Sequence, residues 1–226
     1  IIPKNKYNLG ITKNLQRCIK HCTGEYIAIC EGDDYWVDDK KIEKQVNYLE
    51  SNIDCSMCFN KLYLYYQDQD AMIIHPSQEK IKTESKFTIK DLIYDNFIGN
   101  FSCCMYRKKL VDFLNENIYN FYTVDWMFNM AISEFGKIGF IDEVMSVYRI
   151  HGGGAWSGNS EEKKLLDWIE CIDVYDEFFK RKYKKEFRNL KKRIYANLYA
   201  ICGEKNFIKK MILYGYKSKL TNLIKK

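Results

Sequence analysis

Three carboxylates are crowded into one short segment near the start of the chain. Glu31, Asp33 and Asp34 directly follow an apolar run over residues 26–30. Neighbouring carboxylates repel one another, and this repulsion costs stability unless a positive charge lies among them. A divalent cation would supply that charge, and oxygen ligands favour Mg²⁺ or Mn²⁺, held by one or two carboxylates and by phosphates of a substrate. The pattern indicates either a metal and phosphate site or a solvated acidic turn that begins the next helix.

The elements around this segment follow an α/β pattern. Apolar residues recur at helical spacing before it, at Ile11, Leu15, Cys18, Ile19 and Cys22. Residues 26–30 are continuously apolar, which predicts a strand covered on both faces. Another helical stripe follows, at Ile42, Val46 and Leu49. A helix, a buried strand and a helix predict a doubly wound α/β fold, in which ligands bind outside the carboxyl ends of the strands.

The rest of the chain predicts further strands and helices. We expect strands at 55–66 and 100–108, a loop or hairpin at 67–86, and helices at 88–96 and 124–135. Residues 137–141 and 143–150 predict two paired strands around a turn at Asp142 and Glu143. Three glycines, 152–154, predict a mobile loop, and the chain beyond residue 160 predicts only helices.

Composition excludes several classes of protein. The chain has 226 residues, enough for one sizeable core with an extension, and no apolar run approaches the roughly 20 residues of a membrane helix. Its nine cysteines are scattered, which favours reduced thiols in a cytoplasmic protein. Residues 161–226 hold 18 Lys or Arg against 9 Asp or Glu, so the net positive charge belongs to the C-terminal part. No nucleic-acid motif accompanies this charge, and we expect no nucleic-acid partner.

The segment NLGITKNLQRCIKHCTGEYIAICEGDDYWVDDKKIEKQVNYLE resembles the middle of a family 2 glycosyltransferase. These inverting, nucleotide-sugar-dependent enzymes have the GT-A fold. The resemblance continues through SCCMYRKKL, VDWMFNMA and EVMSVYRIHGGGAWS, in the family's order. It implies a Rossmann-like mixed sheet flanked by helices, with a catalytic domain over 1–158 and a basic helical extension over 159–226. It also implies that the first nucleotide-binding strands lie upstream of Ile1.

The resemblance assigns roles to the acidic residues. Asp34 is the expected principal ligand of Mn²⁺ or Mg²⁺, with Asp33 at the donor ribose or a second metal position. Asp125 occupies the place of the catalytic base, and Trp126 is expected to shape the acceptor site beside it. The family's usual acid before that base is replaced by Val124. The assignment of the base therefore depends on Asp125 alone.

The resemblance also assigns binding residues. Asn8, Gly10 and Asn14 match the loop and helix that precede the metal-binding strand, and Arg149 matches a substrate-binding position. His151 matches a position that can reach the metal or the diphosphate, and a hydrogen-bonded histidine at a strand end is the alternative. Residues 152–154 with Trp156 predict either a lid over the donor or a plain surface turn.

The resemblance implies an enzyme that moves a sugar from a nucleotide-sugar donor, a UDP-sugar, to a polysaccharide, lipid-linked or protein acceptor. Such chemistry belongs to polysaccharide biosynthesis at the cell envelope. A catalytically inactive GT-A-fold binding module is the alternative. The expected location is the cytoplasm, with the basic extension either packed on the catalytic domain or bound to the inner face of the membrane.

Overall fold

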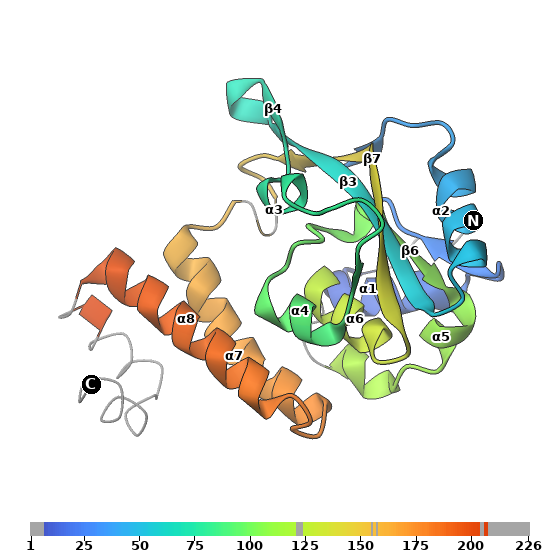
Figure 1. Cartoon of the computed structure of the whole chain (residues 1–226). Coiled ribbons are helices and arrows are strands. Elements are labelled where there is room, and N and C mark those ends of the chain that lie inside the picture. The colour runs from blue at the N-terminus through green and yellow to red at the C-terminus, as the bar shows by residue number, and fades with distance from the viewer. Residues whose placement is uncertain (1–6, 121–123, 155, 157, 204–205, 208–226) are drawn as a thin grey trace. The chain divides into compact units, whose positions relative to one another are not determined.

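The computed structural model describes residues 7–120, 124–154, 156, 158–203 and 206–207. The chain divides into two compact units, residues 1–154 and 155–226. This boundary lies four residues before the one that the sequence predicts. Figure 1 shows the first unit as a twisted sheet with helices and the second as two long helices.

The described part of the first unit contains a seven-stranded mixed sheet with the order β1-β6-β3-β7-β2, to which β4 is added beside β3 and β5 beside β7. The strands are β1 (Tyr26–Ala28), β2 (Tyr35–Trp36), β3 (Cys55–Tyr66), β4 (Ala71–Ile74), β5 (Lys86–Phe87), β6 (Cys104–Arg107) and β7 (Lys137–Ile150). β3 and β7 are parallel, and β6 is antiparallel to both β1 and β3. β1, β3 and β7 therefore run in the same direction, and their carboxyl ends share one edge.

The predicted pair of strands around Asp142 and Glu143 is wrong. Residues 137–150 form one strand, β7, which runs parallel to β3 along its whole length. The register shifts between the pairs Asn60–Ile141 and Lys61–Val144, so Asp142 and Glu143 form an irregularity within the strand. The carboxylate of Asp142 accepts a hydrogen bond from Thr83 and forms an ion pair with Lys61. Glu143 forms an ion pair with Lys44, so each of these two acidic residues in the strand has a cationic partner.

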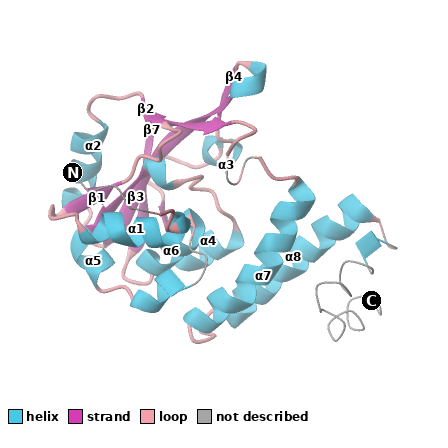
Figure 2. Ribbon diagram, turned by 180° about the vertical axis from the view of Figure 1, so that it is seen from behind, coloured by secondary structure: helices cyan, strands magenta, loops and turns pink. Residues whose placement is uncertain are grey.

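Helices lie on both faces of this sheet, as Figure 2 shows. They are α1 (Gly10–Lys20), α2 (Lys41–Ser51), α3 (Pro76–Glu79), α4 (Ile89–Tyr94), α5 (Lys108–Asp112) and α6 (Asp125–Ser133), with 3₁₀ turns η1 (Gln67–Gln69), η2 (Phe101–Cys103) and η3 (Glu116–Asn120). Met105 of β6 packs in one cluster with Leu49 of α2. The next residue, Tyr106, meets the ring of Phe128 in α6 at 5.3 Å between centroids. Successive side chains of a strand point to opposite faces, so α2 and α6 cover opposite sides of the sheet.

Local signals place two helices where the sequence predicts them. Thr88 and Asp91 form a reciprocal capping box at the start of α4, which satisfies two backbone or hydroxyl donors at that end. α6 buries every residue from Trp126 to Ser133. A helix that is apolar on nearly all sides belongs in the interior, and its first residue, Asp125, is half-buried at its start.

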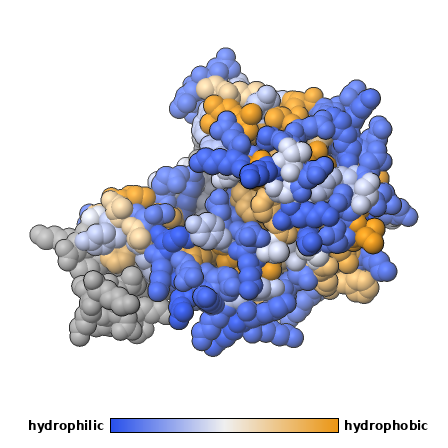
Figure 3. Space-filling model, in the orientation of Figure 1, coloured by the Kyte–Doolittle hydropathy of each residue, from blue (hydrophilic) through white to orange (hydrophobic). Residues whose placement is uncertain are grey.

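Figure 3 shows mainly hydrophilic surface on the first unit, with hydrophobic side chains near β4. Met72 and Ile73 of β4 are each nearly half exposed. β4 forms a hairpin with the end of β3, one of the two alternatives for residues 67–86.

The second unit consists of α7 (Glu161–Phe178) and α8 (Lys184–Cys202), which pack against each other. Ser160 caps α7 by accepting the backbone N–H of Lys163 at 3.2 Å. Leu190, Ile194 and Leu198 of α8 are buried, whereas Ile201 is 53% exposed. The ring of Trp156 lies 5.0 Å from that of Trp168 in α7, with an angle of 56° between the ring planes. Residue 155, between the three glycines and Trp156 of the predicted lid, lies outside the described residues. Within the described residues, no helix combines the length and apolar character needed to span a membrane.

Candidate active site

The acidic turn, which contains Glu31, Asp33 and Asp34, lies between β1 and β2. It is at the edge of the sheet where β1, β3 and β7 have their carboxyl ends. Asp34 is held there by three hydrogen bonds. Its Oδ1 accepts the backbone N–H of Arg149 at 3.0 Å, and its Oδ2 accepts Ser102 Oγ–H at 2.6 Å together with the side-chain amide of Asn100. Burial raises the pKa of Asp34, and these donors oppose the rise. The contacts explain how a carboxylate is held at this position.

Asp33 and the end of β7 are joined by two side chains. Arg149 Nε donates to the backbone carbonyl of Asp33 at 2.7 Å, and its Nη1 donates to Gln67 Oε1, just after β3, at 2.8 Å. His151 Nε2 lies 3.2 Å from Asp33 Oδ2. Arg149 and His151 therefore meet the acidic turn, and their expected contacts with the substrate and the metal stay predictions. In this structure the guanidinium group of Arg149 orients protein groups of the turn.

Asp125 begins α6, and its position is held from α4 and from the segment that follows α4. Trp126 is 5% exposed, and its indole N–H donates to the carbonyl of Leu92 at 2.7 Å. Asn96 Nδ2 donates to Asp125 Oδ2 at 3.3 Å. Burial raises the pKa of Asp125 to about 6, against the opposing effects of the Asn96 hydrogen bond and the backbone N–H groups at the helix start. The indole of Trp126 anchors the start of α6, and its expected role at the acceptor site stays a prediction.

The charge of Asp125 and the charges of the acidic turn affect the pKa values of the same neighbouring side chains. Burial raises the pKa of Glu31 to about 8, and the charges of Asp125, Asp34 and Asp33 add to this rise, Asp125 most. The pKa of Tyr148 on β7 is raised by burial and then by the same four carboxyl groups. Interactions between charges weaken with distance, so groups that act on the same neighbours lie in the same part of the fold. Asp125 and the acidic turn therefore belong to one region, with Glu31 and Tyr148 close to both.

Several residues of this region were missed by sequence reasoning. Glu31 was noted as part of the acidic segment but received no role, although its place at the end of an apolar run was the available signal. Ser102, Asn100 and Asn96 were missed completely. Their contacts with Asp34 or Asp125 join residues between 29 and 68 positions apart, and no local pattern marks such contacts.

The predicted residues before β1 lie at the start of α1 and on that helix. Asn8 Oδ1 accepts the backbone N–H of Gly10 at 2.9 Å, and Gly10 has φ = 73°, a conformation that favours glycine. Asn14 is exposed on α1. In the part of the chain that the structure describes, no hydrogen bond connects these three residues to the acidic turn. Their expected contact with the substrate stays a prediction.

The donors at the acidic turn fit a cation that is also held by a substrate. No group of three or more His, Cys, Asp or Glu side chains in the described residues is arranged to hold a metal ion. Two adjacent carboxylates remain, with the imidazole of His151 beside Asp33. Mg²⁺ sites commonly use one or two carboxylates and complete the shell with water and substrate phosphates. Asp33 and Asp34 supply this number of carboxylates.

A mixed sheet flanked by helices, with an acidic turn at the carboxyl end of β1, defines the GT-A class of α/β proteins. The model of glycosyl transferase family 2 matches residues 1–114, and the chain belongs to this family. An uncharacterised protein of Mycobacterium tuberculosis and one of Mycobacterium bovis are each 31% identical to it over 161 residues, covering 71% of this chain and 45% of theirs. An uncharacterised glycosyltransferase of Methanocaldococcus jannaschii is 25% identical over 173 residues, covering 74% of this chain and 57% of its own length. The chain thus spans about half the length of these relatives.

Proposed function

We propose that this chain carries the active site of an inverting glycosyltransferase. It transfers a sugar from a nucleotide-sugar donor, a UDP-sugar, to a hydroxyl group of a polysaccharide, lipid-linked or protein acceptor. Membership of glycosyl transferase family 2 supports the reaction class. The observation that supports the assignment of residues is the joint electrostatic effect of Asp125 and the acidic turn on Glu31 and Tyr148.

In this proposal Asp125 is the general base. Its carboxylate takes the proton of the acceptor hydroxyl while that oxygen forms a bond to the anomeric carbon of the donor. The bond from the anomeric carbon to the diphosphate oxygen breaks on the opposite face, so the configuration inverts. A base is most effective when its pKa lies near the working pH, and burial brings the pKa of Asp125 to about 6. General-base catalysis contributes about 10²- to 10⁴-fold in rate.

In this proposal the acidic turn stabilises the negative charge of the leaving diphosphate. Asp34 and Asp33 would hold Mn²⁺ or Mg²⁺, which when bound supplies electrophilic stabilisation of the diphosphate oxygens. Arg149 fixes the turn through the carbonyl of Asp33, and His151 lies beside the same residue. The turn is therefore held in place before the donor arrives, which reduces the reorganisation needed in the reaction.

Calorimetric titration of the protein with UDP, with and without Mn²⁺, tests the donor site. We expect Mn²⁺-dependent binding that Asp34→Ala abolishes and Asp125→Asn preserves, because Asp125 is assigned to the acceptor side. Donor turnover should be lost in both variants. Asp112→Asn in α5 removes an exposed carboxylate that pairs with Lys108 and serves as the control. Unchanged turnover in both Asp34→Ala and Asp125→Asn would overturn the proposed mechanism.

A catalytically inactive binding module is the second candidate, and the replacement of the family's usual acid by Val124 favours it. If the chain is such a module, UDP binding should depend on Asp34 and no donor turnover should be detected. Measuring binding and turnover on the same preparation separates the two functions.

A further inference from the structure

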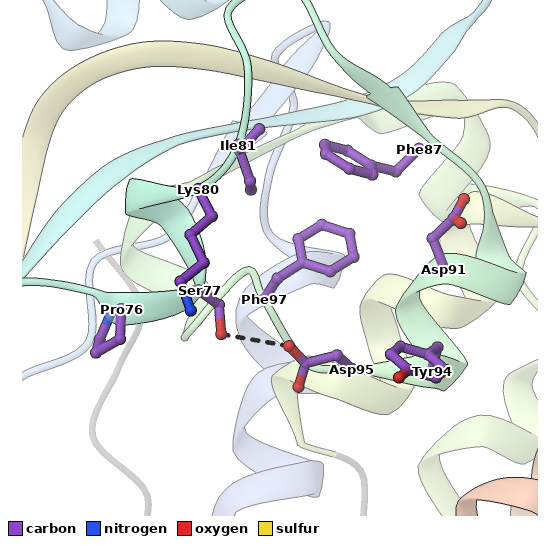
Figure 4. Close-up of a pocket in the computed structure, with 9 residues that line it drawn as sticks. All are labelled: Pro76, Ser77, Lys80, Ile81, Phe87, Asp91, Tyr94, Asp95 and Phe97. Atoms are coloured by element: carbon purple, nitrogen blue, oxygen red, sulfur yellow. Dashed lines mark hydrogen bonds between the residues drawn. The ribbon is translucent and has the colours of Figure 1, made fainter.

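The segment between α4 and η2 holds Asn96 against Asp125. Asp95 has extended backbone angles, φ = −151° and ψ = 139°. Figure 4 shows the side chains of Asp95 and Phe97 in a pocket of about 430 Å³. Successive side chains of extended backbone point to opposite sides. Asn96 therefore points away from this pocket, and its Nδ2 donates to Asp125 Oδ2 at 3.3 Å.

Both neighbours of Asn96 are anchored. Phe97 packs on Phe87 with 4.5 Å between ring centroids, and Asp95 Oδ2 accepts Ser77 Oγ–H at 3.3 Å, the dashed line in Figure 4. On the other side, the indole hydrogen bond of Trp126 ties α6 to α4. These contacts fix both the segment that carries Asn96 and the start of α6. They therefore hold the amide of Asn96 beside the carboxyl group of Asp125.

The amide of Asn96 has a second polar atom that the described residues leave without a partner. Its Oδ1 is buried and has no hydrogen-bond partner among the residues that the structure describes. Buried acceptors without a partner cost stability, and they call for an explanation. An amide carries its donor and its acceptor on one terminal torsion, which has two broad, roughly equivalent orientations. Rotation about this torsion would present either atom to Asp125.

We propose that Asn96 is a positioning residue that serves both protonation states of Asp125. Its N–H is donated to the carboxylate before transfer. When the acceptor hydroxyl has given its proton to Asp125, Oδ1 accepts the hydrogen bond of the resulting carboxylic acid. Release of that proton to solvent restores the carboxylate and the first orientation of the amide. This inference rests on the proposed role of Asp125 as the base.

Other titratable groups face Asp125 from neighbouring elements. They are Glu31 from the acidic turn, Tyr148 from β7 and Tyr106 from β6, and the charge of Asp125 raises the pKa of each of them. The side-chain amide of Asn96 opposes the effect of burial on the pKa of Asp125, as do the backbone N–H groups of Trp126 and Asp125 at the start of α6. Removing its amide should therefore raise the pKa of Asp125 further.

Carbon-13 NMR titration of the aspartate carboxyl groups, with Asp125 assigned through Asp125→Asn, measures this effect without any activity. We expect Asn96→Ala to raise the pKa of Asp125 by about one unit, the size typical of a lost hydrogen bond to a charged group. Asn96→Asp keeps the shape and adds a like charge, so it should raise one pKa of the pair by more and give a two-step titration. Asn52→Ala removes an amide that donates to the carbonyl of Tyr48 at 2.8 Å, at the end of α2, and should leave the pKa of Asp125 unchanged.

The side-chain amide resonances of Asn96 test the second orientation. They should move with the same midpoint as the carboxyl group of Asp125. An unchanged pKa of Asp125 in both Asn96 variants would overturn the positioning role. Amide resonances that stay constant through the titration would overturn the exchange of orientation. Failure of the proposed function is separate, because it appears as full turnover in Asp125→Asn and leaves the titration of the wild-type protein intact.

Discussion

Ser102 and Asp34 are joined by a hydrogen bond of 2.6 Å, although 68 residues separate them. The same hydroxyl oxygen accepts the backbone N–H of Glu31 at 3.0 Å. The backbone carbonyl of Ser102 accepts Trp36 Nε1–H and Ser146 Oγ–H, each at 2.9 Å. One buried serine therefore connects both ends of the acidic turn to β7.

Ser102→Ala should weaken the metal-dependent site without removing a carboxylate. Loss of a hydrogen bond to a charged group costs about 1.5 to 3 kcal/mol, so the free energy of unfolding should fall by roughly this amount. The affinity for UDP with Mn²⁺ should fall about tenfold, because Asp34 loses a donor that fixes its orientation. Chemical unfolding and calorimetry measure the two effects. Ser133→Ala, which removes a hydrogen bond within α6, is the control and should leave UDP affinity unchanged. Wild-type affinity in Ser102→Ala would contradict the positioning of Asp34 by this hydroxyl.

The acid side of the pH profile should report Asp125. Burial raises its pKa to about 6, and the base acts only as the carboxylate. The rate of donor turnover, as kcat/KM, should therefore decline as pH falls through about 6, tenfold per unit below it. A profile that stays flat down to pH 5 would contradict the assignment of Asp125.

Because the pKa of Asp125 is raised, Asp125→Asn should make the folded protein more stable although it removes the activity. A carboxyl group whose pKa is higher in the folded protein than in the unfolded chain favours folding most at low pH, and this contribution is lost as pH rises from about 4 to 6. At pH 7 the ionised Asp125 therefore opposes folding by up to about 3 kcal/mol, since one pKa unit corresponds to 1.36 kcal/mol. Asp125→Asn should raise Tm at pH 7, and the gain should shrink below pH 5. Thermal unfolding at both pH values measures it, and a loss of stability at pH 7 would contradict the expectation.

Gly139 should tolerate no side chain. A Cβ at this position of β7 would lie 2.1 Å from Cε1 of Tyr48 in α2. Overpacking of this kind costs about 1 to 3 kcal/mol, so Gly139→Ala should lower Tm by several degrees. Gly24→Ala is the matched control, because a Cβ there would lie 3.5 Å from its nearest neighbour, the carbonyl of Tyr26. Equal Tm values for the two variants would show that Tyr48 moves aside without cost.

Variants of the basic surface of α8 test the expected contact of the C-terminal extension with a membrane. Its exposed cations include Lys184, Lys185, Arg188 and Lys192. Binding to anionic lipid contributes about 1 kcal/mol per basic residue near the surface. Replacement of these four residues by Ser should therefore release the protein from phosphatidylglycerol vesicles at low salt, measured by co-sedimentation. A control variant carries the same loss of charge in the first unit, at Lys40, Lys80, Lys82 and Lys109. Wild-type protein that stays in the supernatant would end this proposal.

The sequence by itself determined the features that depend on neighbours along the chain. The apolar run before Glu31 predicted β1, the stripe through Leu49 predicted α2, and Thr88 predicted the start of α4. Together with the motifs of family 2, these patterns were enough for the fold class and for the selection of Asp34 and Asp125. Periodicity and capping are local properties, and they can be recognised without knowledge of what lies opposite.

Only the tertiary structure decided which side chains meet. Residues 137–150 remain one strand because β3 offers a parallel partner along its whole length, and no pattern near Asp142 indicates this partner. Likewise, Ser102 reaches Asp34 and Asn96 reaches Asp125 because the sheet and α6 bring distant segments to one edge. The pKa of Asp125 depends on the same packing. Burial raises this pKa, and the whole fold, not the residue type, decides how deeply a side chain is buried.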